Sequence, residues 1–350
     1  MKRKSPLRRA VLASLVVAAF VGPAVGSGCG GAFPPVSQVS GLRVLAVVAD
    51  KPYAQPGDTV TFTMTYANPV GAAAPQILWL GPCVNPPGGT YYGCYSQLAS
   101  LMPGLGDTFS VTLPEDFLAP PITQGTAFVF FAACDGTVGA LDGGASGGLA
   151  GSFPLGCFDA NGQQLSADAF VPGYTQVYGF EDGRTNHNPA VTGLSINQVP
   201  TDAGVGDGGS VTPCPVPEAS RLGVSGCGKA DPFQQCQDDR AEYQITVDVP
   251  PGVAEVDDAN KSPATGQPQY EVVWVDYFAD QGDIDTPTAL INAAEPVSDA
   301  GPALQSSFST NWIAPPAPAG DAGALPVNIW AVVHDNRGGE TVAHEILQVP

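Results

Sequence analysis

Residues 58–67 read DTVTFTMTYA, and this stretch decides the fold class. Four threonines alternate here with four apolar side chains, those of Val60, Phe62, Met64 and Tyr66. Because successive side chains of a β-strand point to opposite faces, the alternation predicts a strand with one buried face and one wet face. A sheet of such strands buries its apolar face against a second sheet, so we expect a β-sandwich.

The composition favours the same fold class along the whole chain. The 350 residues include 43 glycines and 35 prolines, and short runs rich in Val, Ile, Thr, Phe and Tyr recur between turn residues. Long segments with helical periodicity are absent. This combination is typical of all-β proteins.

The series of predicted strands occurs twice. The first copy runs from LRVLAVVAD (residues 42–50) to YTQVYGFED (174–182), and the second from AVTGLSIN (190–197) to ETVAHEILQV (340–349). The third strand of each copy carries a tryptophan, Trp79 or Trp274. A buried tryptophan on the third strand is a feature of immunoglobulin-like sandwiches, so we expect two tandem Ig-like domains without the usual inter-sheet disulfide.

The N-terminal segment has the features of a secretory signal. MKRKSPLRR carries five positive charges and is followed by an apolar run, residues 10–21, and then by small residues. The run is too short to span a bilayer, which takes roughly 20 residues. We therefore predict a signal peptide over residues 1–28 and an extracytoplasmic protein.

Cys29 ends this segment and resembles the lipidated cysteine of a bacterial lipobox. Gly26 departs from that pattern, in which a leucine is usual. The resemblance implies a lipid anchor in the outer membrane or at the cell surface. Ordinary cleavage, with Cys29 left as a thiol or disulfide partner, is the alternative.

The predicted limits of the parts follow from these patterns. They are a signal peptide at 1–28, a tether at 29–41, domain 1 at 42–183, a junction at 184–189 and domain 2 at 190–350. Together with the NHNP junction and the Asp-Ala-Gly loops, such as residues 202–204, this organisation resembles predicted surface lipoproteins of myxobacteria. The HDNRGGE turn, residues 334–340, resembles that of PKD-related bacterial Ig-like modules. The resemblance implies a fold and a compartment and brings no known activity.

The net charge limits the classes of partner. At −20, the chain lacks the clustered Lys and Arg that bind the phosphates of nucleic acid. Anionic membrane surfaces are disfavoured for the same reason, so contact with a membrane is expected only through the lipid anchor. The expected partner is a protein or a glycan.

Eight cysteines in an exported chain predict disulfides. We expect Cys83 to pair with Cys94, and Cys134 with Cys157, because each pair brackets a turn-rich excursion. Cys214, Cys227 and Cys236 then supply one bond and one unpaired cysteine. Zinc is the alternative for these three, although their spacing is not of the C-x₂-C type.

Two of the three histidines, His334 and His344, lie in the last predicted hairpin. If its turn spans six residues, His334 faces Thr341 and His344 points to the opposite face. A shift of one residue would put both on one face. We expect two strand histidines; the less favoured alternative is a metal-dependent hydrolase built on this region.

Other candidate sites are weaker. Four acids in DYFADQGDIDTP could hold calcium, namely Asp276, Asp280, Asp283 and Asp285, although a solvated acidic loop is the simpler interpretation. A Gly-x-Ser-x-Gly match at 144–148 lies in a glycine-rich loop with no helix after it, so it does not predict a nucleophile elbow. His187 lies in the junction.

Tyrosines cluster in and beside the predicted Cys83–Cys94 loop, at positions 91, 92 and 95. Tyrosine offers a large contact area at a low entropy cost, so Tyr91, Tyr92 and Tyr95 are a candidate recognition loop. The alternative is that they cover one end of the domain 1 core. Overall, the sequence predicts a non-enzymatic surface module for binding, display or spacing, with no resident cofactor. An accessory subunit of an envelope complex, docked by a sheet edge or by the loop around Tyr91, is the alternative.

Overall fold

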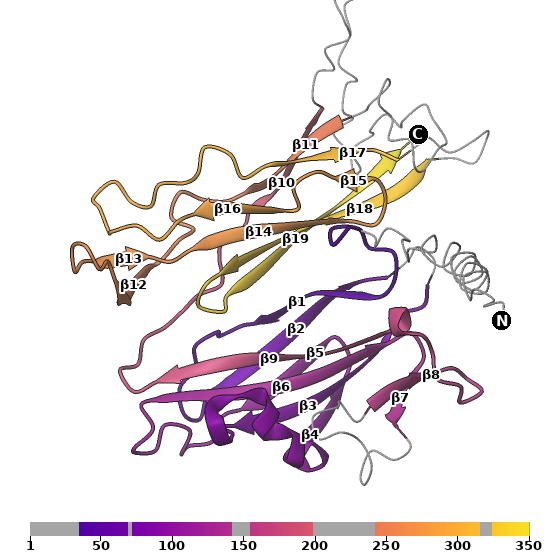
Figure 1. Cartoon of the computed structure of the whole chain (residues 1–350), viewed down its shortest axis with the longest axis horizontal. Helices are drawn as coiled ribbons and strands as arrows, with labels where there is room; N and C mark the ends of the chain where they lie inside the picture. The colour runs from indigo at the N-terminus through magenta and orange to yellow at the C-terminus, as the bar shows by residue number, and fades with distance from the viewer. Residues whose placement is uncertain (1–34, 69–71, 142–154, 199–241, 316–323, 350) are drawn as a thin grey trace, which may run out of the picture. The chain divides into compact units, whose positions relative to one another are not determined.

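A computed structural model describes residues 35–68, 72–141, 155–198, 242–315 and 324–349. The described residues from Val36 onward fall in one compact unit. The predicted all-β sandwich fold is confirmed, because the described chain is built from antiparallel sheets and short 3₁₀ segments (Figure 1).

The first sandwich pairs a three-stranded with a four-stranded sheet. The strand order of the smaller sheet is β1 (Arg43–Ala49), β2 (Thr59–Ala67) and β5 (Thr108–Thr112). The order of the larger one is β4 (Met102–Leu105), β3 (Gln76–Val84), β6 (Gln124–Cys134) and β9 (Phe170–Phe180). Beside them lie the hairpin of β7 (Thr137–Ala140) and β8 (Leu155–Phe158) and the 3₁₀ segments η1 (Pro87–Gly89), η2 (Tyr91–Ser100) and η3 (Ala167–Ala169).

The second sandwich pairs two four-stranded sheets. One has the order β10 (Gly193–Gln198), β11 (Glu242–Asp248), β17 (Thr310–Ile313) and β15 (Asp283–Ile284). The other has the order β16 (Thr288–Asn292), β14 (Val273–Ala279), β18 (Leu325–Asp335) and β19 (Glu340–Val349). A separate ribbon is formed by β12 (Val256–Lys261) and β13 (Pro268–Tyr270).

The alternation that predicted the fold is realised in β2. Val60, Phe62 and Met64 are at most 4% exposed and lie in the core of the first sandwich. The threonines point the other way, and the hydroxyls of Thr59 and Thr61 hydrogen-bond across to β5 at 2.9 Å. Because one face of this strand is apolar and the other carries hydroxyls, a shift of one residue in its register would bury the hydroxyls.

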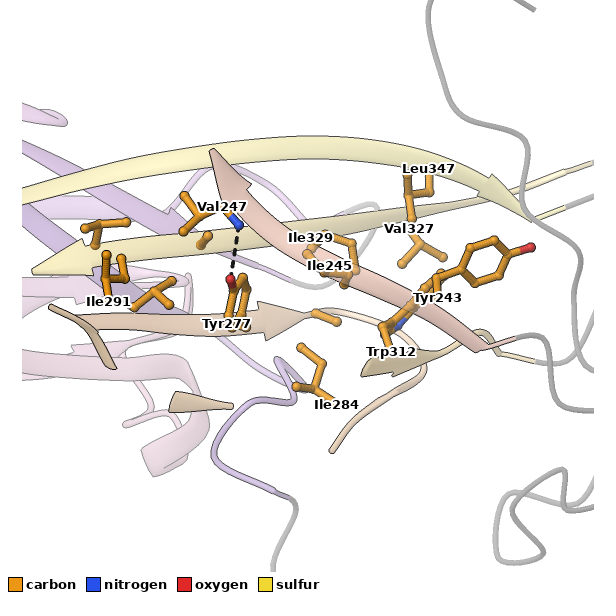
Figure 2. Packing of buried hydrophobic residues seen from close by; sticks show 14 of the residues in the cluster. Tyr243, Ile245, Val247, Tyr277, Ile284, Ile291, Trp312, Val327, Ile329 and Leu347 are labelled. Atoms are coloured by element: carbon orange, nitrogen blue, oxygen red, sulfur yellow. Dashed lines mark hydrogen bonds between the residues drawn. The ribbon is translucent and has the colours of Figure 1, made fainter. Parts of the chain in front are cut away.

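The two sandwiches place their tryptophans differently. Trp79 on β3 is fully buried and donates its indole N–H to the carbonyl of Gly106 at 2.7 Å, as expected. Trp274 is not its equivalent, because the odd-numbered residues of β14 point into the core and Trp274 lies on the outer face. The buried tryptophan of the second sandwich is Trp312 on β17, whose ring centroid lies 5.8 Å from that of Tyr243 (Figure 2).

The outer face of β14, β18 and β19 packs against the first sandwich. Trp330 and Val332 form one apolar cluster with Leu45, Ala46 and Ala67 of β1 and β2. The predicted limits of the two domains stay predictions, because the described residues from Val36 onward fall in one compact unit.

The predicted junction, residues 184–189, adds polar contacts to this interface. The side-chain amide of Asn188 donates to the carbonyl of Ala49 at 2.8 Å and accepts from the N–H of Glu340 at 3.0 Å. The Glu340 carboxylate in turn accepts from the N–H of Val47 at 3.1 Å. The junction is therefore hydrogen-bonded on both sides.

Candidate functional site

The predicted recognition loop folds as a cap on the outer face of the sheet β4-β3-β6-β9. Cys94, in η2, forms a disulfide with Cys83 of β3. Beneath η2 lie Phe128 and Phe130, which point outward from β6 and are nevertheless at most 3% exposed. The tyrosines therefore cover the outside of a sheet and not one end of the core.

The cap gathers a cluster of four tyrosines, which we call the tyrosine face: Tyr91, Tyr92, Tyr95 and Tyr174. Tyr91 lies at the centre of this cluster. The centroid of its ring is 4.0 Å from that of Tyr92 and 4.2 Å from that of Tyr174. Tyr95 packs edge-on to Tyr92, and its ring centroid lies 6.2 Å from that of Phe130. Such tilted and stacked ring pairs hold one another in place.

Two rings of the tyrosine face remain open to solvent. Tyr92 is 60% exposed and Tyr174 is 43% exposed. Sequence reasoning missed Tyr174, which lies on β9 about eighty residues beyond the loop. Alternation in FVPGYTQVYGF puts Tyr174 on the face opposite to the buried Val177, and this signal could have identified it.

The strands and 3₁₀ segments that build the tyrosine face carry no charged side chain. No Asp, Glu, Lys, Arg or His occurs between Asp58 and Asp107, which includes β3, η1, η2 and β4, nor within β6 or β9. In a chain with 33 acidic residues, this sheet face is an exception. Burial, and after it the neighbouring hydroxyls of Tyr92 and Tyr174, raise the pKa of Tyr95, so its hydroxyl stays neutral at physiological pH.

The two candidate histidines lie on one face of β18 and β19, and the register with the six-residue turn is wrong. His334 pairs with Glu340, one residue short of Thr341. The cause is Asp335, whose side chain accepts the N–H groups of Arg337 and Gly339 at 2.7 and 2.8 Å and closes a five-residue turn.

The histidines do not converge on a common centre. His334 stacks on Trp274 with ring centroids 5.2 Å apart, and His344 stacks on Trp330 at 5.1 Å. The ring nitrogens of His334 lie 3.3 Å from a carboxylate oxygen of Asp276 and 3.3 Å from one of Glu340. Burial alone would lower the pKa of His334, but these two carboxylates outweigh it and raise that pKa to about 9.

The acids of the calcium alternative lie in different surroundings. The carboxylate of Asp276 accepts from Thr288 and faces His334, whereas that of Asp280 accepts from the backbone and side chain of Asn328 at 2.9 and 2.6 Å. Across the described residues, no group of three or more His, Cys, Asp or Glu side chains could hold a metal ion. Asp283 and Asp285 therefore complete no such group.

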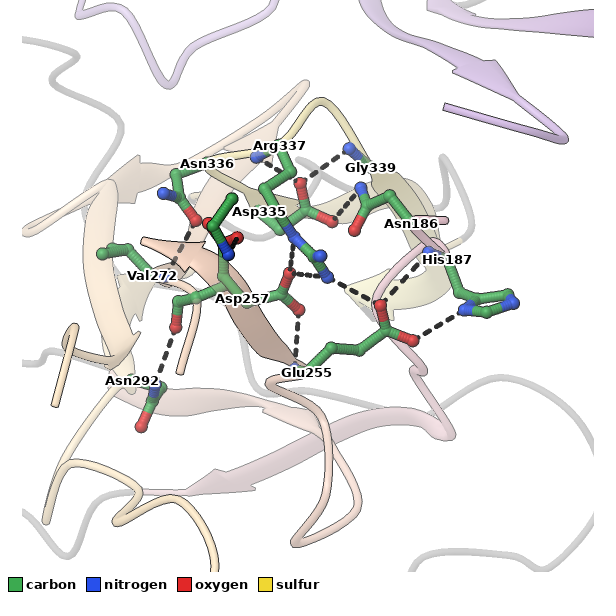
Figure 3. A network of polar contacts seen from close by, with 12 residues as sticks. Asn186, His187, Glu255, Asp257, Val272, Asn292, Asp335, Asn336, Arg337 and Gly339 are labelled. Atoms are coloured by element: carbon green, nitrogen blue, oxygen red, sulfur yellow. Dashed lines mark hydrogen bonds and ion pairs between the residues drawn. The ribbon is translucent and has the colours of Figure 1, made fainter. Parts of the chain in front are cut away.

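A buried ion-pair network lies at the base of the second sandwich (Figure 3). Arg337, 8% exposed, donates to Glu271 at 2.7 Å and to Glu255 at 2.6 Å. Glu271 is fully buried, which raises the pKa of its carboxyl to about 7 against the opposing effect of Arg337. Nδ1 of His187, in the junction, hydrogen-bonds to Oε1 of Glu255 at 2.7 Å.

This network connects the junction to the terminal turn. The side-chain amide of Asn186 donates to Asp335 at 3.0 Å, beside the turn that Asp335 closes. A cavity of about 800 Å³ next to it is lined by charged side chains that pair with one another, Arg184 with Asp182 and Arg337 with Glu255. We interpret the network as structural, since Arg337, Glu255, Glu271 and Asp335 each already have hydrogen-bonded or ion-paired partners within the protein.

The structure contains both disulfides expected from cysteine spacing, Cys83–Cys94 and Cys134–Cys157. Cys29, Cys214, Cys227 and Cys236 lie outside the described residues, as do the signal peptide and the Gly-x-Ser-x-Gly match. Within the described ranges, no helix has the length and apolar character needed to cross a membrane.

Comparisons with known proteins identify no family. No family model matches the chain, and no curated protein matches it. A solved structure, dimeric latent PorU from Porphyromonas gingivalis, aligns with 89% of this chain at 9% identity and a TM-score of 0.20. The chain spans only 24% of the length of that protein, and at this TM-score the similarity carries no argument.

The geometry around His334 predicts that stability falls as pH rises from about 7 to about 9. In this window the folded protein keeps His334 protonated while the unfolded chain, with the ordinary pKa of 6.5, does not. The stabilisation, up to about 3 kcal/mol, is complete below pH 6.5 and lost as pH passes 9. Urea unfolding of the wild type and of His334→Gln between pH 7.5 and 9.5 measures it.

The His334→Gln variant should show a nearly flat stability in the same window. Glu271 contributes little to the slope between pH 7.5 and 9.5, because a carboxyl with a pKa of about 7 is already mostly ionised at pH 7.5. An equally steep decline in wild type and variant would contradict the assignment.

Proposed function

We propose that the protein is an exported, non-enzymatic lipoprotein that acts as a binding module at the cell surface. The observation that supports this is the tyrosine face, a pre-formed aromatic surface on a charge-free sheet. Exposed tyrosine rings are a feature of protein binding surfaces. Because Tyr92 and Tyr174 are held by neighbouring rings, little side-chain entropy remains to be lost on binding.

The compartment belongs to the same proposal. Two disulfides in the described chain suit an oxidising, extracytoplasmic environment. The N-terminal signal and Cys29 would deliver the chain there and anchor it by lipid, with residues 29–41 as a tether.

Anchoring through Cys29 predicts that Cys29→Ser moves the protein from the membrane fraction to the soluble fraction. The substitution removes the only sulfur to which the diacylglycerol would be attached and leaves the folded domains unchanged. Fractionation of cells that express either form measures this. Equal membrane partitioning of both forms would refute the anchor.

Binding through the tyrosine face predicts that Tyr92→Ala/Tyr174→Ala reduces retention on isolated cell envelopes. We expect about tenfold weaker binding, since exposed aromatic anchors dominate such contacts. The comparison uses soluble protein that carries Cys29→Ser, and Leu290→Ala is the matched control, because Leu290 is 40% exposed on β16 of the other sandwich. Binding that survives the double substitution unchanged would contradict the proposal.

A further inference from the structure

We infer that the ligand of the tyrosine face is a neutral polysaccharide chain. This inference rests on the proposed function and names the chemical class of its partner. Three properties of the face point to it: the chemistry of the exposed rings, the absence of charge, and the size of the aromatic area.

The chemistry of the rings suits sugars. A pyranose ring has one or two faces of C–H groups and a rim of hydroxyls, so it can stack on an aromatic ring while its hydroxyls stay hydrogen-bonded. Tyrosine supplies the electron-rich ring face and, in its hydroxyl, a neutral donor and acceptor. Tyr92 and Tyr174 expose such surfaces on either side of the central Tyr91.

The charge pattern selects against ionic ligands. An anionic polymer would approach a protein of net charge −20 against electrostatic repulsion and would find no cation on this sheet. A cationic ligand would find no carboxylate there to pair with. A neutral ligand incurs neither cost, and its binding should depend little on salt.

The size of the aromatic area favours a sugar chain over a second copy of this protein. At 60% and 43% exposure, Tyr92 and Tyr174 offer roughly 200 Å² of accessible surface, taking about 200 Å² for a whole tyrosine. A stable protein interface needs about 800 Å² from each partner. Two ring faces instead match two sugar residues of a chain.

The geometry is also fixed in advance. Gly88 and Gly89, with φ of 81° and 66°, let the chain reverse before η2, and the Cys83–Cys94 disulfide ties η2 to β3. Gly93 lies against Pro87, where a Cβ would come within 2.7 Å of the carbonyl oxygen. The rings therefore do not have to be ordered by the ligand.

The test uses the mature chain carrying Cys29→Ser and two sets of soluble polymers. The neutral set is dextran, laminarin and galactomannan, and the anionic set is alginate and polygalacturonate. Affinity electrophoresis screens both sets, and calorimetry at low and high salt follows any polymer that binds. We expect binding to at least one neutral polymer, little change with salt, and no binding to the anionic set.

Matched variants connect binding to the face. Tyr92→Ala/Tyr174→Ala should weaken binding about tenfold or more, Tyr92→Phe/Tyr174→Phe should weaken it less, and Leu290→Ala should leave it unchanged. Because the Phe variant keeps the rings and removes only the hydroxyls, it separates the contribution of the hydroxyls from that of the rings.

Several results would overturn the inference. They are binding to none of the neutral polymers, equal binding of anionic ones, affinity that survives the Ala substitutions, and a self-association that these substitutions abolish, which would make a second copy the occupant. If neutral polymers fail while envelope retention still depends on Tyr92 and Tyr174, only the ligand class is wrong. If envelope retention is also indifferent to these tyrosines, the proposed function fails with it.

Discussion

The packing of η2 on the outward phenylalanines of β6 is the constraint on which the candidate binding surface depends. A ten-residue 3₁₀ segment has poor hydrogen-bond geometry and would not persist alone. It persists here because it buries Phe128 and Phe130 and because Cys83–Cys94 limits the unfolded alternatives, a contribution of about 3 kcal/mol for a loop of this length. This cap therefore fixes the positions of Tyr91, Tyr92 and Tyr95, which lie in η2.

Among the described residues, the second sandwich packs away from that surface. The second sandwich packs on β1 and β2, which belong to the other sheet of the first sandwich, through the cluster around Trp330. The polar side chains in this region have partners within the protein. Asn188 hydrogen-bonds to both sandwiches, and Arg337 pairs with Glu255 and Glu271. These charged and hydrogen-bonding groups therefore stabilise the structure, whereas two rings of the tyrosine face, those of Tyr92 and Tyr174, are exposed to solvent.

Local patterns predicted the sheets well, and contacts between distant segments could not be predicted from them. Alternation placed Val60 and Phe62 correctly, and short spacings were enough to pair Cys83 with Cys94 and Cys134 with Cys157. The equivalence of Trp274 with Trp79 was wrong, because the phase of a strand relative to its core is set by the opposing sheet. The register around His334 depended on Asp335 capping its own turn, and Tyr174 joins the tyrosine face only through the pairing of β9 with β6.

Amide hydrogen exchange with and without the Cys83–Cys94 bond tests whether η2 is a separate layer held on the sheet by this disulfide. We expect Cys83→Ala/Cys94→Ala to remove protection from the amides of η2 while those of β6 and β2 in the same sandwich keep theirs. The cap would then be a separate, disulfide-held layer that positions the tyrosines. Unchanged protection in η2, or an equal loss across the whole first sandwich, would contradict it.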